Sequence, residues 1–274
     1  MIKKIIHIAD LHIRNVIRHE EYAEQLTKIV DKCAEIAEPY EKNEVRIVIA
    51  GDIVHQKNTI SNELFILTSA FIRKLEEIAK VIIISGNHDL VEQNKSRKDT
   101  LTALFDTAEF SNAFFLDESL GYQSGLVEDD NVTWALYSIH DGYNRPDIEE
   151  AKIDNPKNTI IGLFHGTVVG TSLYNGTVSE VGVPNSLFSG CDIVMAGHIH
   201  KRQEMQYKDT SIVYAGSPIQ QDEGETVTQH GFVVWDLENK THEYVDIDSE
   251  YGIYKIKINS ESDIDNDKEE LYNY

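Results

Sequence analysis

The chain has only two cysteines and five prolines in 274 residues, and it has no long apolar run. With so few cysteines we expect no disulfide framework, and Cys33 and Cys191 are predicted to be small buried residues. No apolar stretch approaches the roughly 20 residues that a membrane span requires. The first apolar run stops at Asp10, a candidate ligand described below, which cleavage of a signal peptide would remove. We therefore expect a cytoplasmic protein, or one associated with the nucleoid or nucleus, that is neither secreted nor embedded in a membrane.

Basic residues are also scarce, since 25 Lys and Arg stand against 47 Asp and Glu, a formal net charge of −22. Such a charge repels phosphate backbones at long range and slows association with nucleic acid. The acidity is uneven, because residues 222–274 hold fifteen Asp or Glu and four Lys, a net of −11. Two explanations are open: solvated surface with an acidic tail, or a tail that contacts a basic partner.

Five short segments carry the side chains that bind metal ions. They are Asp10-Leu11-His12, Gly51-Asp52 with His55 close behind, Gly86-Asn87-His88-Asp89, His165-Gly166, and Gly197-His198-Ile199-His200. Each follows a short, largely β-branched run, as strand-to-loop transitions do: residues 5–9, 45–50, 81–85, 159–164 and 192–196. The ligands should therefore gather at one edge of a sheet, where several strands end.

The remaining pattern predicts the elements around this edge. Apolar spacing and capping residues predict helices over 19–38, from Ser61 to about 78, over 100–109, and a short one from Pro184. Strands are predicted over 131–139, 203–207, 211–214, 230–235, 242–247 and 252–258. Strand–helix units followed by a run of strands indicate an α/β fold, a four-layer αββα sandwich of mixed sheets. We expect one domain over residues 1–258 and an acidic tail, or a linker to a missing C-terminal region, over 259–274.

The residue types point to metal-assisted hydrolysis. Two divalent ions held about 4 Å apart can clamp a phosphate and generate a bridging hydroxide near neutral pH. Asp52 is the natural bridging ligand, because a carboxylate offers two oxygens. Carboxylate, imidazole and amide donors suit Mn, Fe or Zn better than Ca or an all-oxygen Mg site. We expect Asp89 to hydrogen-bond to His88 and fix its tautomer, which would make His88 an acid rather than a ligand.

Any one of these residues alone would more often be structural, and Gly-Asn-His-Asp alone could be a plain turn. In all five segments and in their order, however, the chain resembles the calcineurin-like metallophosphoesterases over about residues 1–247. The resemblance implies one metal ion held by Asp10, His12, Asp52 and His200, and a second held by Asp52, Asn87, His165 and His198. It also implies that His88 protonates the leaving oxygen or stabilises the transition state.

Other segments are most similar to the DNA-repair nucleases of the SbcD and meiotic-recombination-eleven type. They are Ala9 to His12, Gly51 to His55, Tyr214-Ala215-Gly216-Ser217-Pro218, and residues 222–233. This resemblance implies a manganese-dependent DNA exonuclease or endonuclease of double-strand-break repair and recombination. In it, His55 would position or protonate a DNA phosphate.

The same resemblance implies partners. They are DNA, an SbcC-type ABC ATPase, and a second copy of the chain bound through the early helices. Leu64, Leu67, Phe71 and the stripe Leu101, Leu104 and Phe105 could form that homodimer contact or could equally be core. The chain is short for this family and lacks most of its capping domain and its ATPase-binding helices. It would then be a compact, phage-like version or the catalytic domain alone.

Basic residues near the ligand segments are candidate DNA contacts, with ordinary solvated surface as the alternative. They are Arg14, Arg18, Lys57, Lys95, Arg97, Lys98, Lys201 and Arg202. Two other functions are open. One is a metallophosphatase or cyclic-nucleotide phosphodiesterase on the same fold, and the other is a non-catalytic scaffold that binds metal and docks partners.

Overall fold

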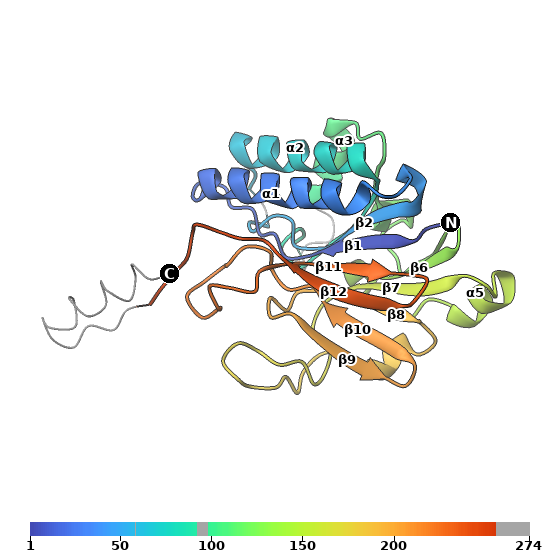
Figure 1. The fold of residues 1–274 in the computed structure, drawn as a ribbon. Helices are drawn as coiled ribbons and strands as arrows, with labels where there is room; N and C mark the ends of the chain where they lie inside the picture. Colours follow the sequence, from blue (N-terminus) through green and yellow to red (C-terminus); the bar gives the residue numbers. More distant parts are fainter. Residues whose placement is uncertain (58, 92–97, 256–274) are drawn as a thin grey trace, which may run out of the picture.

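A computed structural model describes residues 1–57, 59–91 and 98–255 of the chain. Two six-stranded mixed sheets lie face to face in it (Figure 1). The first has the order β12-β11-β1-β2-β3-β4 and the second the order β5-β6-β7-β8-β10-β9. The proposed domain boundary after residue 258 and the acidic tail over 259–274 lie outside the described residues.

The first sheet has a parallel centre. It consists of β1 (Lys4–Ile8), β2 (Val45–Ala50), β3 (Lys80–Ile84) and β4 (Ala113–Phe115). On the other side of β1, β11 (Gly231–Asp236) pairs antiparallel with it, and β12 (Thr241–Asp246) pairs antiparallel with β11 at the edge of the sheet. The second sheet is built in the same way. Its parallel strands are β6 (Val132–Tyr137), β7 (Thr159–His165), β8 (Ile193–Gly197) and β10 (Thr210–Tyr214), and its antiparallel edges are β5 (Gly125–Asp129) and β9 (Gln203–Tyr207).

Helices cover the outer faces of the two sheets. The first sheet is covered by α1 (His19–Ala37), α2 (Asn62–Ile78) and α3 (Thr100–Ala108) (Figure 1). The second is covered by α5 (Ile148–Asp154) and the 3-10 turn η3 (Asn185–Phe188). The structure also contains two short 3-10 helices, η1 (Lys42–Glu44) and η2 (Ile139–Asp141), and a single-turn α-helix, α4 (Leu116–Ser119). The predicted four-layer helix–sheet–sheet–helix sandwich is therefore confirmed.

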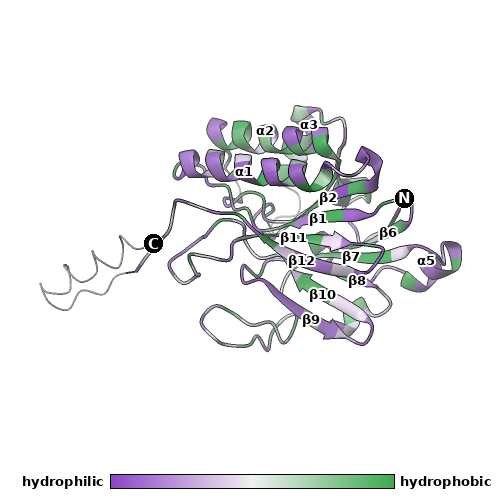
Figure 2. Cartoon of the chain, viewed as in Figure 1, coloured by the Kyte–Doolittle hydropathy of each residue, from purple (hydrophilic) through white to green (hydrophobic). Residues whose placement is uncertain are grey.

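Alternate residues of a strand point to opposite faces of its sheet, so both faces of each sheet can be apolar. The protein therefore has three apolar layers, one between the two sheets and one under the helices on each side. Along β1, Ile6 and Ile8 face the helices, whereas Ile5 faces the second sheet. α1 and α2 show polar and apolar surfaces on different sides (Figure 2), and their apolar sides pack on the first sheet. A third apolar layer lies on the outer face of the second sheet and includes Phe164 and Phe188.

The residues considered for a dimer contact belong to the core under these helices. Leu64, Phe71, Leu101 and Leu104 are buried there, and Leu67 and Phe105 pack against them partly buried. A contact between two copies would therefore have to use other residues of the early helices. Cys33 and Cys191 are buried and free, as predicted. None of the helices in the described ranges has the length and apolarity that a bilayer crossing requires.

Most predicted elements are present within one or two residues of their expected ends, and Ser61 caps α2 as predicted, accepting from the Leu64 amide. One prediction is wrong. Residues 252–255 form no strand, and 256–258 lie outside the described ranges. The side chain of Gln220 supplies what a partner strand would have supplied. Its Oε1 accepts from the Ile253 amide at 2.7 Å, and its Nε2 donates to the Ile253 carbonyl at 3.0 Å.

Candidate metal centre

The five ligand segments meet at one place, as the strand order requires. The first three follow β1, β2 and β3, neighbours in the first sheet, and the last two lie at the ends of β7 and β8 in the second. The sheets touch there, because His165 Nδ1 lies 2.7 Å from the Ala50 carbonyl at the end of β2. Glycine allows this approach. A side chain at Gly86 would overlap Asp52, and one at Gly197 would overlap the Ala50 carbonyl.

Four of the seven predicted ligands have a left-handed backbone. The φ angles are 54° at Asp10, 48° at His12, 52° at Asp52 and 93° at His198. Positive φ is uncommon in residues with a side chain and costs on the order of 1–3 kcal/mol each. Hydrogen bonds between the loops hold these conformations, for example His12 N–H to the Asp52 carbonyl at 2.9 Å. Such concentrated strain is typical of a functional site.

The first donor group consists of Asp10, His12 and His200, whose ligand atoms lie within 4.8 Å of one another. His200 Nδ1 donates to the Glu225 carboxylate at 2.6 Å, so its Nε2 carries a lone pair when the ring is neutral. That Nε2 lies 2.9 Å from His12 Nε2. Two imidazole nitrogens this close repel unless a proton or a cation stands between or beside them.

The second donor group consists of Asp52, His165 and His198, again within 4.8 Å of one another. The Asn87 side-chain oxygen joins it, at 2.8 Å from His198 Nδ1 and 3.2 Å from His165 Nε2. Because His165 Nδ1 donates to a backbone carbonyl, its Nε2 is the atom directed into the group. All members except Asn87 and His198, which are half-buried, are shielded from solvent.

Asp52 lies between the two groups. Its Oδ2 is 3.5 Å from His12 Nε2 on one side and 3.2 Å from His165 Nε2 on the other. Its Oδ1 accepts the backbone N–H of His88 at 2.7 Å, which fixes the carboxylate in place. This is the position that a bridging ligand would need.

Burial and the neighbouring charges shift the pKa values of the carboxyl and imidazole groups in the two donor groups. Burial opposes ionisation of Asp52, but His165 and His12 outweigh it and hold the pKa of Asp52 well below its usual range. Burial likewise opposes charge on His165, and the Asp52 carboxylate overcomes it and raises the pKa of His165 to about 9. Burial raises the pKa of Asp10 to about 6. A buried carboxylate that stays anionic and draws a proton onto His165 is an environment that favours cations.

The donor set therefore fits divalent cations. Carboxylate, imidazole and amide atoms from five separate segments converge at one place, and two of the imidazoles are oriented by acceptors behind them. Such mixed oxygen and nitrogen donors suit first-row transition ions.

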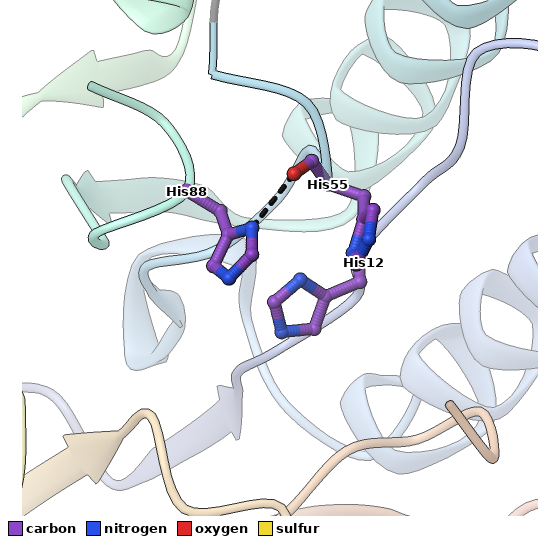
Figure 3. A group of neighbouring side chains, drawn as sticks. All are labelled: His12, His55 and His88. Atoms are coloured by element: carbon purple, nitrogen blue, oxygen red, sulfur yellow. Dashed lines mark hydrogen bonds between the residues drawn. The ribbon is translucent and has the colours of Figure 1, made fainter. Parts of the chain in front are cut away.

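His88 and His55 stand beside these two donor groups and form a third cluster with His12, whose ring nitrogens also lie within 4.8 Å of one another (Figure 3). His88 Nδ1 donates to the His55 carbonyl at 2.7 Å. The His88 ring stacks on the His55 ring with centroids 5.0 Å apart, and it meets the His12 ring at 4.7 Å and a right angle. His55 Nε2 in turn lies 3.3 Å from the Arg14 guanidinium. Sequence reasoning placed His55 at the site, and the structure brings it into contact with both other rings.

The expectation that Asp89 hydrogen-bonds to His88 is wrong. Asp89 is fully buried and points away from that ring, with Oδ2 accepting the amides of Asp52 and Gly86, each at 2.8 Å, and Oδ1 accepting the amide of Val54 at 3.1 Å. The carboxylate therefore connects the loop after β2, which holds Asp52, with the loop after β3, which holds Gly86. The two side chains diverge because His88 and Asp89 are adjacent in a tight turn, and the acceptor on His88 is a carbonyl instead.

The candidate DNA contacts have different surroundings. Three form ion pairs within the chain: Arg18 with Glu21, Lys98 with Asp106, and Arg202 with Asp246. Arg18 also donates to the Gln220 carbonyl and is mostly buried, so it is a structural residue. Arg14, Lys57 and Lys201 are half-buried near the ligand segments. Lys95 and Arg97 lie outside the described residues.

Sequence reasoning missed the residues that support the ligands from behind. Glu225, which orients His200, is the clearest. Ser217 Oγ donates to the Asp10 carbonyl at 2.8 Å, and Tyr214 donates to the Gly166 carbonyl at 2.8 Å. Both lie in the segment from Tyr214 to Pro218, and Glu225 lies in the segment 222–233. The resemblance to the nuclease family therefore covered the segments that hold these residues, but it did not indicate what any one of them does.

Two proteins of similar sequence can be named. The chain is 36% identical over 268 residues to uncharacterized protein R555 of Acanthamoeba polyphaga mimivirus, covering 94% of this chain and 19% of that protein. It is 27% identical over 272 residues to the SbcD component of the SbcCD nuclease of Staphylococcus saprophyticus, covering 86% of this chain and 66% of that component. The chain thus spans about a fifth of the first relative and less than two thirds of the second.

Solved structures with some likeness include an archaeal phosphodiesterase, with a TM-score of 0.43 and 14% identity, covering 89% of this chain and 99% of that one. Another is the phosphopantetheinyl hydrolase of Mycobacterium tuberculosis, with a TM-score of 0.41 and 11% identity, covering 78% and 88%. A family description, calcineurin-like phosphoesterase, matches residues 3–202. These residues include all five ligand segments, and the chain belongs to the calcineurin-like phosphoesterase family.

Proposed function

We propose that the chain is a DNA nuclease that uses two divalent metal ions, with manganese as the first ion to test. The observation that supports the nuclease over other phosphoesterases is His55. Its ring packs against His12 and His88 at the metal centre, outside both donor groups, with Arg14 behind it. The similarity to a component of the SbcCD nuclease agrees with this choice.

In this proposal each donor group holds one ion. Asp10, His12 and His200 would hold the first, and Asn87, His165 and His198 the second, with Asp52 shared between them. The ions would supply positive charge to the phosphate oxygens and activate water near neutral pH. Asp52 faces both groups and is ionised over the working pH range, so it is suited to the shared position.

The protein's own proton chemistry would come from His88. Its Nδ1–H is committed to the His55 carbonyl, so Nε2 is the atom that can carry and release a proton. We assign it to protonate the leaving oxygen. His55 would contact a phosphate oxygen beside it. Asp89 has no catalytic role here and acts as the brace that keeps the Asp52 and Gly86 loops in register.

Arg14, Lys57 and Lys201 would be the DNA contacts nearest the ions. Few such residues on a chain of net charge −22 predict weak binding at physiological salt. An SbcC-type ATPase would supply the remaining affinity, and a homodimer would present two such sites. A cytoplasmic or nucleoid-associated location follows from that role.

The deciding experiment offers the protein linear double-stranded and single-stranded DNA with Mn²⁺, beside bis(p-nitrophenyl) phosphate. We expect both DNA and the small diester to be cleaved, and chelation by EDTA or the variant Asp52→Asn to abolish both activities. Cleavage of the diester without cleavage of DNA would favour a phosphatase or cyclic-nucleotide phosphodiesterase. Hydrolysis of neither, with metal bound, would favour a scaffold.

A further inference from the structure

A cavity of about 450 Å³ opens beside the metal centre. It shares His198 and His200 with the two donor groups, so an occupant would lie next to a phosphate held at the metal centre. Its other walls are partly apolar and partly polar. The apolar part consists of Leu173, Tyr174 and Ile199, and the polar part includes Asn175, Lys201 and Asp222. The volume is in the range of small-molecule binding sites.

The apolar wall is held in a defined position. Tyr174 lies in the loop between β7 and η3. Hydrogen bonds between Ser172 of this loop and the side chain of Gln203, at the start of β9, hold the loop in place. Gln203 Oε1 accepts from the Ser172 amide at 2.7 Å, and its Nε2 donates to the Ser172 carbonyl at 2.9 Å. The loop is closed on itself by Leu173 N–H to the Thr177 carbonyl at 2.9 Å. The Tyr174 hydroxyl reaches the His200 carbonyl at 3.4 Å.

The chemistry of the walls defines the occupant. An aromatic ring with Leu173 and Ile199 offers a surface for a flat apolar face. The amide of Asn175 and the carboxylate of Asp222 offer donors and acceptors for a polar edge. Because the cavity adjoins His198 and His200, the occupant must also be joined to the phosphate by a short link. A nucleobase on its sugar meets all three conditions, whereas an aliphatic alcohol has no flat face and the ring of a phosphotyrosine has no polar edge.

We propose that this cavity binds the nucleobase of the nucleotide whose phosphate lies at the metal centre, with Tyr174 as the stacking residue. The inference rests on the proposed function. It makes Tyr174 a specificity-determining residue for nucleotidyl substrates and accounts for the loop being fixed against both β9 and His200.

The test compares two chromogenic diesters with the same leaving group in the presence of Mn²⁺: thymidine 5′-(p-nitrophenyl phosphate), and methyl p-nitrophenyl phosphate, which has no base. Stacking on an aromatic side chain contributes about 5- to 100-fold per base. We expect Tyr174→Leu to lower kcat/KM for the thymidine ester by this factor through KM, with the methyl ester changed less than twofold. Tyr174→Phe should restore the preference. Tyr207→Leu, on β9 away from the centre, is the matched control.

A binding measurement decides the same point without turnover. The dissociation constant of deoxyadenosine 5′-monophosphate should rise in Tyr174→Leu, and that of inorganic phosphate should not. Equal losses for the thymidine and methyl esters, or an unchanged nucleotide dissociation constant, would overturn the inference. A protein that prefers the thymidine ester but leaves DNA intact would contradict the nuclease proposal and leave the nucleobase site standing.

Discussion

His200 donates from Nδ1 to the Glu225 carboxylate at 2.6 Å, and Glu225 is itself buried and also accepts the Gln221 amide at 2.9 Å. The pair connects the last ligand segment to the loop between β10 and β11. A carboxylate behind a ligating imidazole fixes its tautomer and increases its basicity, so Glu225 belongs to the metal centre although it touches no ion in the proposed arrangement.

Glu225→Gln should therefore weaken metal binding about 10- to 100-fold, because loss of such a partner has that typical effect. Titration of the metal-free protein with Mn²⁺ by calorimetry measures it. Glu223→Gln is the matched control, since Glu223 lies in the same loop, is exposed and pairs with the exposed Lys255. If both variants bound Mn²⁺ like the unchanged protein, Glu225 would have no role in orienting His200.

His88→Ala should lower kcat by about 10²- to 10⁴-fold on DNA, the range for loss of a positioned proton donor. The loss should be much smaller for p-nitrophenyl esters, because p-nitrophenolate leaves without protonation. Mn²⁺ affinity should stay within about threefold, because His88 belongs to neither donor group in our assignment. An equal loss on both substrates would show that His88 stabilises charge and does not deliver a proton, and a loss of Mn²⁺ binding would make it a ligand.

Asp129→Ala should destabilise the fold by about 3–5 kcal/mol, because it leaves a buried arginine unpaired. Asp129, at the end of β5, receives Arg46 of β2 through two hydrogen bonds of 2.8 and 2.9 Å and so joins the two sheets. Urea denaturation measures the change. Asp130→Asn removes an exposed ion pair with the N-terminus, keeps a residue type that tolerates the positive φ of 55° at this position, and should cost less than about 1 kcal/mol. Similar losses in the two variants would contradict a special role for the buried pair.

The positions of the ligands could be predicted because each follows a buried strand whose composition is itself predictive. For example, Ile47, Val48 and Ile49 predict the strand β2, and Asp52 follows directly after the end of that strand. Elements with a weak signal of their own were not predicted. β4 has three residues and α5 has seven, too few for a period to show, and both are stabilised by contacts with the sheets and the core around them.

The contacts behind the ligands could not be predicted for another reason. Glu225 lies 25 positions after His200 in the sequence, and the Gln220 side chain takes the place of a strand opposite Ile253. Neither pairing has a periodic or local signature. Asp89 shows the opposite error, in which sequence adjacency to His88 suggested a hydrogen bond that the geometry of the turn prevents.

The stability of the protein should fall in mild acid because of His7. It lies in the middle of β1, fully buried between the sheets, and burial lowers the pKa of His7 to about 3. The unfolded chain, in which the pKa is near 6.5, takes up the proton first as the pH falls. His7 therefore contributes fully to the free energy of unfolding above pH 6.5, and this contribution is lost between pH 6.5 and about 3.

Between pH 7 and pH 5 this linkage amounts to about 2 kcal/mol. His7→Leu removes the titrating group and keeps an apolar side chain in the layer that holds Ile5 and Val48. Urea denaturation at both pH values, in EDTA, gives the loss of stability for each protein, and using the difference between the two pH values cancels any packing effect of leucine. We expect the unchanged protein to lose about 2 kcal/mol more than His7→Leu. Equal losses would mean that His7 accepts a proton inside the folded protein.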